Sequence, residues 1–283
     1  MKVKRLLAIA LAVAMMLTVF AGCSKRDPEE EEKKDSVSQT EEKTDEKTEE
    51  ADVPTEETVI TSRDSFVNTM GKLMDLSLYN DLTENYNASY DTFSYHIKYE
   101  NERDYDLDKK IRFADGSEVT LPIKVSELAD RGWGFAYDSS AGTELASGYE
   151  TPSIGFKNSS GKQFEAWVYN HTSVTTTLGN CMVPELTVNL YGSLDPNKKL
   201  DSGIGFTVCG TITENSTLEE VIARLGNPTS VFCTVRRDDT GAFKHSTVEV
   251  TFEQSKATHN HLTIKFSGDK GHIVEMKYSA DVK

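Results

Sequence analysis

The fold of this chain is decided at residues 216–228, which read Ser-Thr-Leu-Glu-Glu-Val-Ile-Ala-Arg-Leu-Gly-Asn-Pro. The apolar residues at 218, 221, 222 and 225 have helical spacing and form one stripe. Ser216 is expected to cap the helix and Glu219 to close a capping box, while Gly226 and Pro228 end it. A helix this short is unstable alone in water, so its stripe must pack on neighbouring elements.

Runs of alternating apolar and polar residues on both sides of this helix predict half-buried strands. The clearest run is 93–99, where Phe, Tyr, Ile and Tyr alternate with Ser, His and Lys. Turn signals such as Asp115-Gly116 separate successive runs and indicate antiparallel hairpins. Further strands are predicted at 111–113, 119–121, 133–137, 154–157, 164–168, 183–190, 204–208, 231–235, 247–252, 262–266 and 273–278.

Two more short helices are predicted, one within 62–80 behind a capping Ser62 and one at 126–131 before Gly132. The sequence thus predicts an α+β fold of antiparallel β-sheets with short helices packed on one face. The order of short helix, glycine and strands occurs twice, which predicts two tandem, similar subdomains. Their expected bounds are 90–195 and 200–283, after an irregular or helical lead-in at 58–89.

Residues 1–23 have the pattern of an export signal with a lipid attachment site. Basic residues at 2, 4 and 5 precede an apolar run of about 15 residues, which is short for a membrane-spanning helix. The run ends in Phe-Ala-Gly-Cys, which resembles a bacterial lipobox, although Leu is usual where Phe20 stands. The resemblance implies that Cys23 carries diacylglycerol and palmitate and becomes the mature N-terminus. The alternatives are an ordinary secretory signal and an uncleaved anchor.

Residues 24–57 predict a disordered acidic linker. They hold 15 acidic and 6 basic side chains and no aromatic residue, too little apolar surface to offset the entropy of ordering. We expect a spacer between membrane and domain; the alternative is a tail that binds cations or a partner. The whole chain has a net charge of −15 and no basic stripe, which argues against nucleic acid as a partner.

The motif at 217–228 resembles the T-x-x-E-V-x-x-x-L-G-x-P opening of the small outer-membrane assembly lipoproteins and the tandem-repeat β-lactamase inhibitor proteins. The resemblance implies a short helix on an antiparallel sheet and a function in binding other proteins. It covers about 13 residues, and the first half departs from it at Gly132-Trp133. The whole chain is also similar to uncharacterised lipoproteins of Gram-positive anaerobes, which implies an extracytoplasmic location.

Few residues suggest chemistry. Cys181, Cys209 and Cys233 follow Cys23; we expect small buried core residues, and the alternative is a Cys209–Cys233 disulfide. The pair His259 and His261 lies at strand spacing, which fits either a metal site or a polar loop. The aspartates at 104, 106 and 108 fail the calcium-loop pattern at its sixth and twelfth positions.

Trp167 and Tyr169 are expected on the sheet face opposite Phe164, Ala166 and Val168. Either a second subdomain covers both faces, or one face is a partner surface, for which Trp and Tyr are typical anchors. The resulting prediction is a lipid-anchored binding or accessory protein on the extracytoplasmic face of the cell membrane. Its partner would be a protein or an envelope polymer, and no catalytic activity, cofactor or metal is expected. The alternative is an extracytoplasmic hydrolase or small-ligand sensor whose site no motif reveals.

Overall fold

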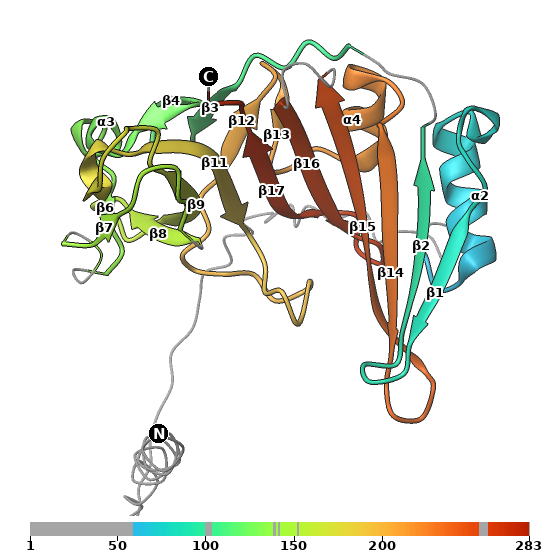
Figure 1. The fold of residues 1–283 in the computed structure, drawn as a ribbon. Helices are drawn as coiled ribbons and strands as arrows, with labels where there is room; N and C mark the ends of the chain where they lie inside the picture. The colour runs from blue at the N-terminus through green and yellow to red at the C-terminus, as the bar shows by residue number, and fades with distance from the viewer. Residues whose placement is uncertain are drawn as a thin grey trace, which may run out of the picture. The chain divides into compact units, whose positions relative to one another are not determined.

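A computed structural model describes residues 59–99, 104–137, 140, 142–151, 153–254 and 260–282. The predicted signal, Cys23 and the linker at 24–57 lie outside this range. The described chain is mostly antiparallel sheet with few helices, which agrees with the coarse fold prediction (Figure 1).

Most strands belong to one large sheet with the order β1-β2-β14-β15-β16-β17-β11-β9-β8-β6, and β5 pairs additionally with β11. Every pairing in it is antiparallel. The strands are β1 Thr83–Asn87, β2 Thr92–Lys98, β5 Ile123–Lys124, β6 Gly134–Phe135, β8 Ile154–Lys157, β9 Gln163–Tyr169, β11 Met182–Asn189, β14 Ser230–Arg237, β15 Phe243–Gln254, β16 Asn260–Ser267 and β17 Ile273–Ser279.

The remaining strands form two small sheets. A four-stranded sheet has the order β13-β12-β3-β4, and a two-stranded ribbon joins β10 to β7. Their bounds are β3 Lys110–Phe113, β4 Glu118–Thr120, β7 Glu144–Leu145, β10 Thr176–Thr177, β12 Phe206–Val208 and β13 Ile212–Thr213. The helical segments are α2 Arg63–Leu73, η2 Leu76–Leu78, α3 Val125–Asp130, η4 Leu178–Asn180 and α4 Leu218–Leu225.

The two larger sheets are each centred on one pairing between distant parts of the chain. In the large sheet β17 lies beside β11, with β16, β15 and β14 on one side and β9, β8 and β6 on the other. In the four-stranded sheet β12 lies beside β3, flanked by β13 and β4. The connection between residues 190 and 205 leads from β11 of the large sheet to β12 of the small one.

Helix α4 forms as predicted, but it begins one residue later. Thr217 is the N-cap, and the capping box is closed by Glu220 and not by Glu219. The side chain of Ser216 instead accepts a hydrogen bond from the backbone of Thr213 at 3.1 Å. Both Ser216 with Glu219 and Thr217 with Glu220 fit the capping-box pattern. Thr217 is the cap because the hydroxyl of Ser216 is bonded within the turn that precedes the helix. Gly226 ends the helix at a φ of 84°, which favours glycine.

The lead-in forms helix α2 with Ser62 as its cap, as predicted, followed by the unpredicted strand β1. All five residues of β1 are exposed, so no apolar alternation announces it, and it forms by pairing with β2. Strand β2 pairs on its other side with β14, far along the chain, and not with strands of the predicted first subdomain. Figure 1 shows α2, β1 and β2 beside β14.

The core lies on one side of the large sheet, which we call its inner face. Phe164 of β9 stacks on Phe113 of the four-stranded sheet, with ring centroids 5.4 Å apart. Phe252 of β15 contacts Tyr105 edge-on, and the ring of Tyr95 on β2 lies against Phe66 of α2. On the opposite, outer face most strand side chains are partly exposed, and the ring contacts there are those of His96 with Phe232 and of Tyr191 with His272. Its exposed side chains make this face a candidate for a site.

Candidate functional site on the outer face of the large sheet

The outer face is defined by the strand residues that alternate with the buried ones. Because registers align directly opposite residues, these side chains form rows across neighbouring strands. One row runs through Phe232, Glu249, Lys265, Glu275 and Asn189. The next runs through Thr251, Thr263, Lys277, Thr187 and Glu165. A third joins His261, Ser279, Glu185 and Trp167.

Ion pairs hold the middle of this face. The ammonium of Lys265 lies 3.5 Å from Glu249 and 3.4 Å from Glu275, so one lysine bridges three strands. Lys277 pairs with Glu185 at 2.8 Å, and the Ser279 hydroxyl donates to the other oxygen of that carboxylate at 2.6 Å. These charges are partly shielded from water, and their pairing holds the side chains in fixed positions on the face.

The connection after β11 forms a wall on the outer face. It folds back on itself through a bridge between Tyr191 and Lys199. The ring of Tyr191 stacks on His272 at 3.9 Å, and His272 Nε2 donates to the Pro196 carbonyl oxygen at 2.8 Å. Asn197 donates to Asp269 at 2.9 Å and thus fastens the connection to the turn between β16 and β17.

Two hollows flank this wall. One, of about 350 Å³, lies over β14 and β15, and we call it the Arg236 recess. The other, of about 480 Å³, lies over β9 and β11 and is lined by Glu165, Thr187 and Asn189. Tyr191 and Glu275 line both hollows. Recesses on either side of a fixed wall give the face a shape that a partner can match.

Arg236 is the distinctive group of the first recess. It is half-buried, and its side chain makes no hydrogen bond or ion pair with any residue that the structure describes. His245 faces it on the neighbouring strand. Burial, followed by the nearby charge of Arg236, lowers the pKa of His245, so this imidazole is neutral at pH 7. The guanidinium therefore lines the hollow as a cation without an ion-pair partner among the described residues.

Aromatic side chains border the same recess. Phe232 is 39% exposed, and Tyr90 is 65% exposed on the turn between β1 and β2. That turn is held beside β14 by the Arg237 amide, which donates to the Asp91 carbonyl at 3.0 Å. Figure 1 shows the turn lying beside the one that joins β14 and β15. The recess thus combines Arg236, the paired Lys265 and aromatic side chains at its border.

The predicted surface residues Trp167 and Tyr169 lie on the outer side of β9, because Phe164, Ala166 and Val168 are buried. Trp167 is 37% exposed, and Tyr169 is half-buried beside Glu150. The predicted orientation is therefore confirmed for this strand. Whether these rings contact a partner stays a prediction.

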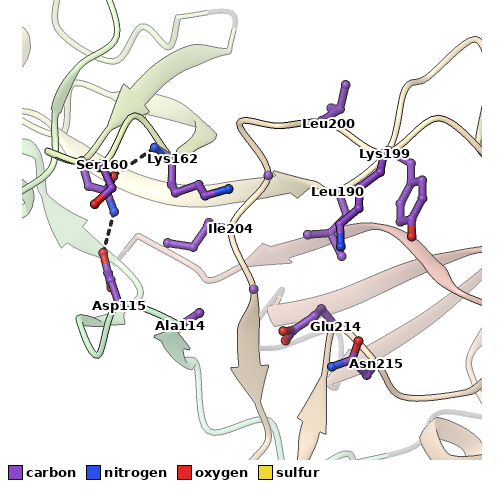
Figure 2. A pocket seen from close by; sticks show the side chains of 14 residues that line it. Ala114, Asp115, Ser160, Lys162, Leu190, Lys199, Leu200, Ile204, Glu214 and Asn215 are labelled. Atoms are coloured by element: carbon purple, nitrogen blue, oxygen red, sulfur yellow. Dashed lines mark hydrogen bonds between the residues drawn. The ribbon is translucent and has the colours of Figure 1, made fainter. Parts of the chain in front are cut away.

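A further hollow of about 450 Å³ lies off this face, where the connection enters β12 (Figure 2). Asp115 lines it from the turn between β3 and β4, Lys162 from the turn between β8 and β9, and Glu214 from the segment after β13. These polar groups have structural partners. Asn158 donates to Asp115 at 2.7 Å, Lys162 donates to the Asp201 carbonyl at 2.8 Å, and Glu214 accepts from the Phe206 amide at 3.1 Å.

The three described cysteines are free and buried, as expected, so the alternative of a Cys209–Cys233 disulfide is not realised. Burial raises the pKa of Cys209 to about 11 and raises that of Cys233 further. Such thiols are poor nucleophiles at neutral pH. They therefore serve as small core residues.

The histidine pair does not form a described site. His259 lies outside the described residues, and His261 lies on the outer face opposite Glu253. Asn260 between them is buried and accepts from the Asp281 amide at 3.0 Å. Within the described part of the chain, no group of three or more His, Cys, Asp or Glu side chains is placed to hold a metal ion.

The sequence did not reveal the pairing of Arg236 with His245. Counting outward from the turn at 238–241 places Arg236 opposite residue 243 or 244, and a β-bulge next to Arg237 shifts the pairing to His245. The wall at 190–200 and the turn of β1–β2 had no sequence signal either, because tertiary contacts place them. None of the described helices is long and apolar enough to cross a membrane.

No family model, curated protein or solved structure matches this chain.

Proposed function

We propose that this chain is a lipid-anchored, extracytoplasmic binding protein that contacts a partner protein through the outer face of its large sheet. The proposal rests on the shape of that face. The face combines the exposed ring of Trp167, the Arg236 recess and a wall held in place by side-chain contacts. Interfaces of this type use aromatic and arginine anchors in pockets, surrounded by polar contacts. An envelope polymer is the second class of partner.

The proposed role is non-catalytic. A hydrolytic site needs a nucleophile, a base and a group that orients the base, at mutual hydrogen-bond distance. The outer face instead carries carboxylates already paired with Lys265 and Lys277. Such paired groups suit complementarity to a surface, because their charges are fixed and partly shielded.

We also propose that the fold is a tandem repeat. If β5, β7, β10 and η4 of the first part are set aside, two series of elements have the same order: β3, β4, α3, β6, β8, β9, β11 and β12, β13, α4, β14, β15, β16, β17. The equivalent strands β11 and β17 pair, as do β3 and β12, which is the arrangement that a local two-fold axis produces. The stacking of Phe66 on Tyr95 supports helices on the inner face.

The proposed anchor is diacylglycerol on Cys23, with residues 24–57 as the spacer that lifts the domain from the membrane. The acidic charge of both parts supports a covalent anchor, because acidic surfaces are repelled by anionic headgroups. Replacing Cys23 by Ser tests this part separately. The expected result is loss of the protein from the membrane fraction and of metabolic labelling by palmitate.

The partner is sought by photo-cross-linking in cells, with a photo-reactive phenylalanine derivative at position 167. Matched probes occupy Phe232, on the same face, and Glu219, which is exposed on α4. We expect one reproducible protein adduct from positions 167 and 232 and none from position 219 or the 24–57 spacer. An adduct from all positions, or from none on the outer face, would contradict the proposed protein-binding role.

A further inference from the structure

We propose that the Arg236 recess binds a single carboxylate, an Asp or Glu side chain of the partner protein that is flanked by an apolar residue. The inference rests on the proposed function and specifies its chemistry.

Arg236 and its neighbour Arg237 differ sharply in their contacts. Arg237 donates to the Gly241 carbonyl at 3.0 Å, and its guanidinium lies 5.6 Å from the centre of the Phe93 ring. Arg236 has no such partner among the described residues, although it is equally half-buried. A guanidinium carries five donors in a planar fork, and partial burial without partners is unfavourable. An incoming acceptor that fits this fork would remove that cost.

The charges around the recess favour an anion with one negative charge. His245 is neutral at pH 7, and the charge of Lys265 is held between Glu249 and Glu275. Among the described residues Arg236 is thus the cation of the recess without an ion-pair partner, and the carboxylates of Glu249 and Glu275, with those of Asp195 and Asp269 that act on His245, repel a more highly charged group. A carboxylate matches one guanidinium bidentately, whereas a phosphate dianion needs further cations. Because the chain as a whole is acidic, Arg236 provides a local position where an anionic side chain can bind.

The rim indicates what stands next to the carboxylate. Phe232 and Tyr90 are exposed at the mouth of the recess, and Tyr191 closes its far side. The hydroxyls of Thr234 and Thr247 also line it and offer further donors, whereas that of Thr92 donates to the Tyr90 carbonyl at 3.0 Å. Apolar or aromatic residues beside the acid would contact these rings while the acid reaches the guanidinium. The partner segment is therefore acidic and apolar in alternation.

The test uses the purified full chain and two capped peptides, acetyl-Phe-Glu-Phe-amide and acetyl-Phe-Gln-Phe-amide. Binding is followed by NMR through the Nε–Hε resonance of Arg236, which is assigned by its loss in R236Q. We expect the Glu peptide to bind at least about tenfold more tightly than the Gln peptide. The control R112Q, which removes an arginine paired with Glu118 on the small sheet, should leave both affinities unchanged.

Equal binding of the two peptides, binding of the Glu peptide that persists in R236Q, or absence of saturable binding would each overturn the carboxylate proposal. A shift of the Arg236 resonance with protein concentration alone would also overturn it, because a second copy would then fill the recess. The cross-linking experiment distinguishes the protein-binding function from the carboxylate site. If the adduct from position 167 survives in R236Q while the peptides fail to bind, the protein-binding function is supported and only the carboxylate site is contradicted.

Discussion

At the scale of single residues, Ser246 is a buried polar side chain for which the described residues offer no hydrogen-bond partner. Gly268 lies against it, donates its amide to the Ser246 carbonyl at 2.8 Å, and leaves no room for a side chain. An unsatisfied buried hydroxyl costs stability, so removing it is favourable.

We predict that S246A raises the free energy of unfolding by about 1 kcal/mol, because it removes that unsatisfied group. The matched control is S267A, on the neighbouring strand. Ser267 is equally buried, but its hydroxyl donates to Asp269 at 2.8 Å and accepts from the Lys270 amide at 3.1 Å. S267A should therefore lower stability by about 1 kcal/mol or more. Urea unfolding measures the free energy of unfolding of both variants. Equal losses of stability in S246A and S267A would show that the Ser246 hydroxyl has a hydrogen-bond partner.

A second residue-scale prediction concerns alkaline pH. Burial, and then the charge of Asp108, raises the pKa of Cys209 to about 11. In the unfolded chain this thiol loses its proton near pH 8.5, whereas the folded chain retains it to about pH 11. Between these values the folded state binds more protons, so stability is full below pH 8.5 and falls as the pH rises.

The expected measurement is a decline in the free energy of unfolding between pH 8.5 and about pH 11, with a smaller slope in C209A. Some slope should remain in the variant, because burial also raises the pKa of Cys233 and Tyr278. Identical slopes in the two proteins would show that Cys209 titrates normally in the folded chain.

At the scale of elements, the sequence was most informative where local pattern and burial agree. The stretch at 216–228 predicted α4 within a residue, and the runs at 231–235, 247–252 and 262–266 all lie within observed strands. Prediction failed for β1, because its residues are all exposed and its strand conformation comes from pairing with β2. Patterns record which side chains are buried, and β1 buries none.

The start of α4 gives the element-scale prediction. Glu219 and Glu220 both lie in the first turn, and both favour the helix dipole. The carboxylate that accepts the Thr217 amide, at 2.9 Å, belongs to Glu220. We predict that E220A destabilises the fold by about 0.5–1 kcal/mol more than E219A. Chemical denaturation of both variants shows which residue caps the helix. A larger loss of stability in E219A would indicate that Ser216, and not Thr217, is the N-cap.

At the scale of the whole molecule, pairings between distant strands could not be predicted. Strand β2 lies beside β14, and β3 lies beside β12, although more than a hundred residues separate β2 from β14 and about ninety separate β3 from β12. An apolar face predicts that a strand is buried on that side, but it does not identify the neighbouring strand. Many strand orders are therefore compatible with the same sequence pattern. The Arg236 recess depends on such placements, since turns and a connection from three regions surround it.

We expect these pairings to join the predicted subdomains 90–195 and 200–283 into one cooperative structure. Both tryptophans precede residue 195, while Ile264 is fully buried in β16. In a W167F background, the fluorescence of the buried Trp133 reports on the first part alone. We predict that I264A lowers stability by about 2–5 kcal/mol and shifts the urea midpoint seen by Trp133 as far as that seen by circular dichroism. The reason is that β11 and β17 share a five-residue ladder, so β11 loses its neighbour when β16 and β17 unfold. A Trp133 midpoint that stays in place while the dichroism midpoint moves would show that the two parts fold independently.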